Sequence, residues 1–203
     1  MSTFSPSVTL RDVIGLDNQL PRLADAAVIM IDFQNTYRTG VMALTGAEEA
    51  LDAGARLLSA ARALGRPIIH IINDGGAGTP YDIRAEIGSI SAEVAPLPTE
   101  TVVVKQVPNA FFGTELEQTL KDLGAGPDLI LAGFMTHMCV TFTAQGAFNL
   151  GYRPTVVAEA TATRPLPGQD GPALSAAALQ SAALTTISDL FGLVAPTVDD
   201  LTS

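Results

Sequence analysis

Three residues that could perform covalent chemistry each follow a short apolar run. Asp32 comes directly after AVIMI, Lys105 ends TVVVK, and Cys139 lies six residues after DLILAG. A thiol attacks a carbonyl carbon only as the thiolate, so a cysteine nucleophile needs a base that takes its proton or a cation that stabilises the anion. A carboxylate and an ammonium group supply these two functions. The three residues together predict a thiol-dependent hydrolase in which Asp32 accepts the thiol proton and later activates water.

Each of these residues alone also fits a purely structural role. A free cysteine is usually a small buried apolar residue, a strand-end lysine can extend to solvent, and a strand-end aspartate can cap a turn. Lys105 is one of only two lysines in the chain. In a buried strand its charge needs an anionic partner, and Asp32 is a suitable one. The combination therefore favours the catalytic interpretation.

The two histidines do not indicate a metal site. His70 lies between Ile69 and Ile71, and we expect it to be a core residue with a hydrogen-bond partner. His137 precedes the cysteine by two residues, where it could line a pocket, donate a hydrogen bond or be structural. Neither histidine has the spacing to other ligands that zinc motifs require. We therefore expect neither a metal nor a cofactor.

Short β-type runs alternate with helical segments, and these elements must position the three residues. We expect strands at about 27–32, 67–73, 101–105, 128–133, 154–158 and 191–195. We expect helices at about 46–64, 83–94, 114–123, 139–150 and 173–190, with capping boxes formed by Thr45 and Glu48 and by Thr114 and Glu117. This order is typical of an α/β fold around a mainly parallel sheet. Ligands of such sheets bind at the carboxyl ends of the strands, where the three candidate residues lie.

Length and charge narrow the class of protein further. The 203 residues fit one domain, which we place at residues 24–203, preceded by an N-terminal arm at residues 1–23. The formal net charge of -10 disfavours nucleic acid and anionic membrane surfaces as partners. One cysteine cannot form an intramolecular disulfide, and the first 20 residues contain no signal-peptide pattern. The expectation is a cytoplasmic protein that acts on a small molecule.

Three longer motifs resemble those of the isochorismatase-like cysteine hydrolases, a family that includes nicotinamidases, N-carbamoylsarcosine amidohydrolases and isochorismatases. The motifs are VIMIDFQNTY around Asp32, VVVKQVPNAFFGTEL around Lys105 and LAGFMTHMCVTFTAQGAFNLGY around Cys139. The resemblance covers about residues 24–194. It implies a three-layer αβα, Rossmann-like fold with an open, mainly parallel six-stranded sheet.

The resemblance also implies roles for single residues. Asp32, Lys105 and Cys139 would form the catalytic triad, with Asp32 as base, Lys105 as the stabilising cation and Cys139 as the nucleophile. The family has a non-proline cis peptide before the nucleophile turn, which corresponds to Phe134–Met135 here. The backbone N–H groups of Met135 and Cys139 would then form the oxyanion hole. We expect the substrate pocket to be lined by Phe33, Tyr37, Phe111, Phe112, Met135 and His137, although core packing is an alternative for at least half of them.

Departures from the subfamily patterns guide the choice of reaction. The segment INDGGAGTPYDI lacks the histidines of the nicotinamidase metal cluster, which makes nicotinamide a doubtful substrate. Cys139 at the nucleophile position favours hydrolysis of a C–N bond in a small amide, carbamoyl or ureido compound through a thioester. The alternatives are a vinyl-ether hydrolase of the isochorismatase kind that uses Asp32, and a non-catalytic binding protein. Members of the family form dimers or tetramers, so a homodimer or homotetramer is expected.

Overall fold

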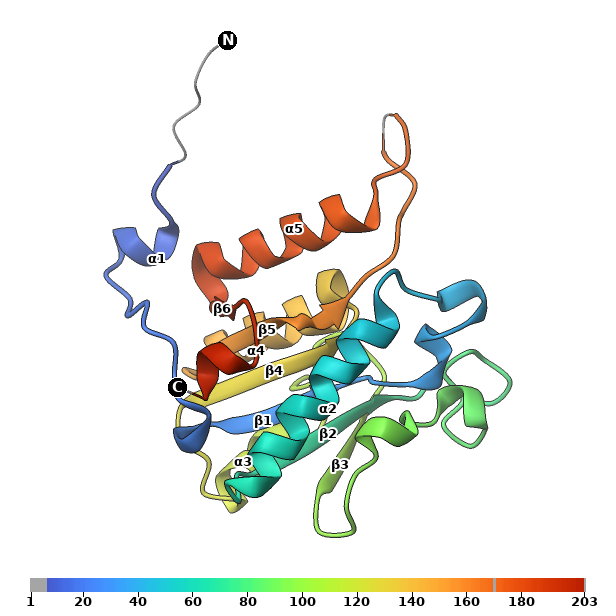
Figure 1. The fold of residues 1–203 in the computed structure, drawn as a ribbon, viewed down its shortest axis with the longest axis horizontal. Coiled ribbons are helices and arrows are strands. Elements are labelled where there is room, and N and C mark those ends of the chain that lie inside the picture. Colours follow the sequence, from blue (N-terminus) through green and yellow to red (C-terminus); the bar gives the residue numbers. More distant parts are fainter. Residues whose placement is uncertain (1–6, 170, 203) are drawn as a thin grey trace.

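A six-stranded parallel sheet forms the centre of the computed structural model, which describes residues 7–169 and 171–202 (Figure 1). Its strands are β1 (Ala27–Ile31), β2 (Ile68–Asn73), β3 (Thr101–Lys105), β4 (Asp128–Phe134), β5 (Arg153–Ala162) and β6 (Leu193–Ala195). Their order across the sheet is β3-β2-β1-β4-β5-β6. All five strand pairs are parallel. The order reverses between β1 and β4, so the strand ends there are the expected place for a ligand site.

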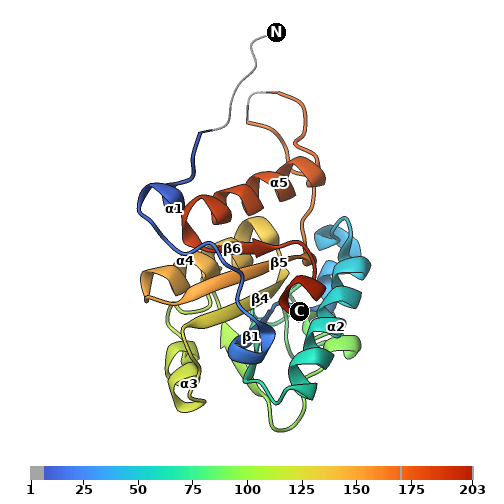
Figure 2. The same cartoon turned by 60° about the vertical axis from the view of Figure 1, so that its left-hand side comes forward.

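Helices cover both faces of this sheet and bury two apolar cores, one on each face (Figure 2). The longer helices are α2 (Ala47–Ala63), α3 (Leu116–Asp122), α4 (Thr141–Asn149) and α5 (Ala176–Thr186), and a short α1 spans Leu10–Val13. The first core lies between α2 and the sheet, and the second between the sheet and α3, α4 and the end of α5. Strands buried on both faces explain the continuous apolar run of β1. The α/β class and the six-stranded parallel sheet expected from the sequence are thereby confirmed.

The segment expected to be a helix at 83–94 is not one. It contains only two single 3₁₀ turns, Glu86–Gly88 and Ala92–Val94. Its backbone groups bond instead to the segment after β1: the N–H of Asn35 donates to Ser89 O at 3.0 Å, and the N–H of Ser91 donates to Phe33 O at 2.8 Å. Backbone groups used in these tertiary bonds cannot also form the i to i−4 bonds of a helix.

Both expected capping boxes are also absent. The N-cap of α2 is Gly46 in the left-handed region (φ +79°), while Glu48 pairs with Arg38. The N-cap of α3 is Glu115, without a side-chain capping bond. The acids of the two motifs are used in ion pairs rather than in reciprocal caps.

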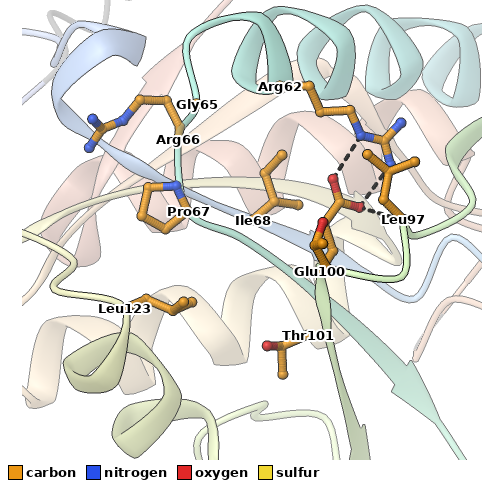
Figure 3. A pocket seen from close by; sticks show the side chains of 10 residues that line it. Arg62, Gly65, Arg66, Pro67, Ile68, Leu97, Glu100, Thr101 and Leu123 are labelled. Atoms are coloured by element: carbon orange, nitrogen blue, oxygen red, sulfur yellow. Dashed lines mark hydrogen bonds and ion pairs between the residues drawn. The ribbon is translucent and has the colours of Figure 1, made fainter.

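A buried charged cluster joins the amino end of β3 to α2 and β2. The Glu100 carboxylate accepts hydrogen bonds from Arg62 at 2.7 and 2.8 Å and from the N–H of Leu97 at 2.9 Å, and it contacts His70 Nε2 at 2.9 Å. Figure 3 shows Arg62 and Glu100 pointing toward each other beside a cavity of about 420 Å³. His70 is 1% exposed. It is therefore the hydrogen-bonded core histidine that the sequence predicts.

The described part of the N-terminal segment packs against the end of the C-terminal helix. Arg11, which is buried, donates to Asn18 Oδ1, to Leu190 O and to Asp17 O. The N–H of Leu10 donates to Asp189 Oδ1. In the described residues, no helix is long and apolar enough to cross a membrane.

Candidate active site

The three candidate catalytic residues meet at the carboxyl edge of the sheet. Asp32 follows β1, Lys105 is the last residue of β3, and Cys139 lies in a π-helical turn, Thr136–Val140, between β4 and α4. Lys105 Nζ lies 2.6 Å from Asp32 Oδ2 and 3.3 Å from Cys139 Sγ. Because β2 separates β3 from β1, the long lysine side chain is what brings a charge from the edge strand to the carboxylate.

Local backbone geometry turns these side chains toward one another. Asp32 has a φ of +49°, the only non-glycine residue with positive φ among the described residues, and its N–H still donates to Ile71 O of β2 at 3.0 Å. The Phe134–Met135 peptide is cis, as the sequence resemblance implies. The carbonyl of Met135 then accepts from the N–H groups of Met138 and Val140, which closes the turn that carries Cys139.

The three side chains of the site are almost completely buried. Asp32 and Lys105 are 0% and 1% exposed, and Cys139 is 8% exposed. A buried carboxylate and a buried ammonium group at this distance compensate each other, whereas either alone would be costly to bury. In a site with so little solvent, each charge acts strongly on its neighbours.

Burial and neighbouring charge set the protonation states. Burial raises the pKa of Asp32, although Lys105 opposes the shift. Burial lowers the pKa of Lys105, but the charges of Asp32 and Cys139 outweigh it and the net pKa is raised. Burial and the Asp32 charge raise the pKa of the Cys139 thiol to about 12. The raised pKa values leave the Cys139 thiol neutral at rest and the Lys105 ammonium group charged beside Asp32.

The Asp32 carboxylate retains capacity to accept a proton. Lys105 contacts Oδ2 as an ion pair, and neither carboxylate oxygen accepts a hydrogen bond of good geometry from the residues that the structure describes. A carboxylate with a raised pKa and unused lone pairs is suited to act as a general base. The arrangement can move a proton from the thiol to Asp32 while Lys105 stabilises the thiolate.

The residues expected to line the pocket fall into different environments. Phe33 and Tyr37 are both 1% exposed and pack edge-to-face on Phe134. Phe111 is partly buried and stacks on Tyr152, whereas Phe112 is 70% exposed on the surface. Phe33 and Tyr37 thus belong to the core on one face of the sheet, whereas Phe111 packs against the core on the other face.

Two other expected pocket residues lie at the π-helical turn Thr136–Val140, which carries Cys139. Met135 is 7% exposed and precedes the turn directly. His137 lies within the turn, half-buried, and its Nδ1 is hydrogen-bonded to Thr163 Oγ1 at the end of β5. Burial and the nearby Arg164 charge lower the pKa of His137.

Three residues around the site are absent from the set that the sequence predicts. Tyr81 packs against Tyr37 with ring centroids 5.8 Å apart, and the charges of Asp32 and Cys139 act on the pKa of both phenols. Asn73 contacts Lys105, and the buried Gln34 binds the backbone of Asn73. Asn73 ends a predicted strand, and this position alone indicates that it lies near the site. No pattern pointed to Tyr81, which a loop brings into place.

The chain matches known proteins over most of its length. The family model described as "Isochorismatase domain" matches residues 26–196. A crystal structure of an isochorismatase from Pseudomonas putida is 40% identical, with a TM-score of 0.91 over 96% of this chain and 99% of that one. An uncharacterised isochorismatase family protein of Bacillus subtilis is 40% identical over 71% of this chain and 81% of its own length. A secreted isochorismatase effector of Verticillium dahliae is 30% identical over 94% and 98% of the two chains.

Two further relatives are named for hydrolytic reactions. A streptothricin hydrolase of Streptomyces noursei is 32% identical over 71% of this chain and 57% of that protein. A ureidoacrylate amidohydrolase of Variovorax paradoxus is 28% identical over 87% of this chain and 80% of that protein. Among the residues that the structure describes here, no group of three or more His, Cys, Asp or Glu side chains is placed to hold a metal ion.

Proposed function

Because this chain belongs to the isochorismatase family of hydrolases, we propose that it hydrolyses a C–N bond in a small amide, carbamoyl or ureido compound through a thioester on Cys139. One observation carries the proposal: a single buried ammonium group, that of Lys105, contacts both Asp32 and Cys139. That contact gives the thiol a base and a counter-ion within one closed site. The name of the ureidoacrylate amidohydrolase relative supports the same bond class.

The reaction proceeds in two halves. Asp32 takes the thiol proton, and the thiolate of Cys139 attacks the carbonyl carbon to form a tetrahedral oxyanion, which the N–H groups of Met135 and Cys139 stabilise. Asp32 returns the proton to the leaving nitrogen, the C–N bond breaks, and a thioester remains. Asp32 then takes a proton from water, the hydroxide attacks the thioester, and the acid leaves as the proton returns to the thiolate. Protons and bonds balance, and the enzyme is regenerated.

A vinyl-ether hydrolase that uses only Asp32 is the second candidate, because Asp32 has unused lone pairs and a raised pKa. Such a reaction needs proton transfer and no nucleophilic sulfur. It would not use the contact between Lys105 and Cys139. The geometry therefore favours the cysteine-dependent reaction.

Arg164 supports a substrate that carries a negative charge. It is the only Lys or Arg side chain with neither an ion pair nor a hydrogen bond to the residues that the structure describes, and its Nε is buried. Its neighbour Thr163 binds His137 of the nucleophile turn. A guanidinium group suits a carboxylate geometrically. We include in the proposal that the substrate is an acidic amide or ureido compound.

The test is an ammonia-release screen over matched acidic and neutral amides, carbamoyl compounds and ureido compounds, with the wild type, Cys139→Ala and Asp32→Asn. We expect the wild type to prefer acidic compounds and both variants to lose at least about 10³-fold in kcat, because each removes a group that the chemistry requires. Arg164→Met should raise KM for acidic substrates and leave neutral ones unchanged. Full ammonia release by Cys139→Ala would contradict the thioester mechanism, and a wild type that releases ammonia from none of these compounds would favour the vinyl-ether class instead.

A further inference from the structure

The Lys105 ammonium group has a third contact that the proposed reaction does not use. Besides Asp32 and Cys139, its Nζ donates to Asn73 Oδ1 at 3.3 Å. An ammonium group has three protons and no lone pair. Lys105 Nζ uses them with three partners, the hydrogen-bond acceptors Asn73 and Cys139 and the ion-pair partner Asp32. Asn73 and Lys105 are also partners in the register of β2 and β3. The amide of one strand end therefore supports the cation of the next.

Asn73 is itself held by Gln34, two residues after Asp32. Gln34 Nε2 donates to Asn73 O at 3.1 Å and to Gly88 O at 2.7 Å, and the N–H of Asn73 donates to Gln34 Oε1 at 3.0 Å. Gln34 is 0% exposed. The Gln34 side-chain amide thus extends the pairing of β1 and β2 beyond the ends of their backbone hydrogen bonds. It also joins the end of β2 to the turn at 86–88. Such a side chain has little freedom to move.

We propose that Asn73 and Gln34 are positioning residues that hold the Lys105 ammonium group between Asp32 and Cys139. This inference rests on the proposed function of the trio. Without a third acceptor, the ammonium group is drawn toward the carboxylate, which is already its nearest partner, and away from the sulfur. A neutral amide is suited to this place because a second carboxylate would compete with the thiolate for the same cation.

The first variant is Asn73→Leu, which removes the acceptor and keeps a similar side-chain volume. We expect kcat to fall by about 10- to 100-fold with KM within about threefold, because a small displacement of a catalytic group costs up to about 10²-fold in rate. Alkylation of Cys139 by iodoacetamide should become slower at a given pH, and the midpoint of its pH profile should shift to higher pH. The reason is that the cation no longer stabilises the thiolate. Intact mass reports the single adduct on the only cysteine.

Further variants separate positioning from loss of structure. Asn73→Asp keeps an acceptor but adds a negative charge, so it should also slow the alkylation of Cys139. If either variant fails to fold, Asn73→Ser replaces it as the variant that is measured. Gln34→Met removes the bonds that hold Asn73, so it should also lower kcat and slow the alkylation of Cys139. Asn35→Ala is the matched control: it removes bonds to Glu86 O and Ser91 in the same loop but none to Lys105, and it should leave both measurements unchanged.

The alkylation profile needs no substrate, so the two hypotheses fail separately. Turnover that survives in Cys139→Ala would overturn the proposed function whatever Asn73 does. If folded Asn73→Leu or Asn73→Ser keeps the wild-type kcat and the wild-type alkylation profile, the positioning role is wrong. An equal loss in Asn35→Ala would show a general effect of the loop and would likewise overturn the role.

Discussion

The protonation state of the Cys139 thiol depends on burial and on the charge of Asp32, which is also its proposed base. Asp32 keeps the resting thiol neutral, since burial and the carboxylate together raise the thiol pKa to about 12. In the proposed reaction, the same carboxylate accepts the proton when a substrate arrives. A neutral resting thiol is less open to adventitious oxidation than a permanent thiolate, because reactivity follows thiolate character.

This coupling gives a prediction for the single substitution Asp32→Asn. Removing the carboxylate while Lys105 stays should lower the thiol pKa and increase the thiolate fraction at pH 8. We expect iodoacetamide alkylation to be at least about tenfold faster than in the wild type, since one pKa unit is a factor of ten, while turnover is lost. Intact mass over a time course measures the rate.

The matched control for this prediction is Asp74→Asn. Asp74 follows β2 at the same edge and pairs with Arg84 rather than with Lys105. Its removal takes one negative charge from the surface of that edge and should leave the alkylation rate within about twofold, because the charge of a partly exposed group is screened by solvent. An alkylation rate in Asp32→Asn that is equal to or below the wild-type rate would contradict the assignment of Asp32 as the group that keeps the thiol neutral.

At the scale of elements, the end of β4 decides where the nucleophile turn begins. Gly133 has a φ of +131° and lies opposite Ile31 of β1, the residue before Asp32. A Cβ at Gly133 would lie 1.8 Å from Ile31 O. The two strands can therefore approach this closely only with glycine at that position.

Gly133→Ala should therefore destabilise the protein by several kcal/mol, on the order of 3 or more, because both the contact and the backbone angle exclude a side chain. Urea unfolding followed by circular dichroism measures the free energy. Gly126→Ala is the control, since its nearest atom would be 3.9 Å away, and it should change the free energy by less than about 1 kcal/mol. Equal stability of the two variants would refute the argument.

The connection at 83–94 shows the limit of sequence patterns at this scale. Its helical periodicity is overridden by backbone bonds to Phe33 and Asn35, which lie more than 50 residues earlier in the chain. Likewise, Glu48 of the expected capping box is used by Arg38. Local propensity is weak enough for one tertiary contact to reverse it.

For the whole molecule, the buried Glu100 cluster links pH to stability. Burial alone would raise the pKa of Glu100, but hydrogen bonds from Arg62, Leu97 and His70 lower it to about 2. A folded pKa below the unfolded value near 4.5 stabilises the protein above pH 4.5, and this contribution is lost as pH falls toward 2. Burial also lowers the pKa of His70, so its contribution is lost as pH falls below about 6.5.

We therefore expect wild-type stability to fall slowly below pH 6.5 and more steeply below pH 4.5. Glu100→Gln should lower the free energy of unfolding at pH 7 by on the order of 3 kcal/mol, and the difference should shrink toward pH 3. Thermal unfolding at several pH values measures it. Glu117→Gln, which removes an exposed pair with Lys121, is the control and should change stability by less than about 1 kcal/mol. A pH-independent difference would refute the linkage.

The order of the strands, the ends of β2 and β3 and the types of the three site residues follow from the sequence alone, whereas β5 runs to Ala162, four residues beyond its expected end. Apolar runs long enough to be buried on both sides define parallel strands, and Asp32, Lys105 and Cys139 stand where those strands end. These are local properties, so they can be derived without coordinates. The resemblance to a family added the cis peptide, which no local pattern indicates.

Only the tertiary structure decided which neighbours act on those residues. Strand pairing brings Asn73 to Lys105 and Gln34 to the backbone of Asn73, and a loop brings Tyr81 to Tyr37. The aromatic residues after Lys105 separate, with Phe111 partly buried and Phe112 exposed. The pKa of the thiol likewise depends on burial and on a charge 107 residues earlier in the chain. Contacts between distant segments depend on how all the layers pack, and the identity of a single residue does not encode them.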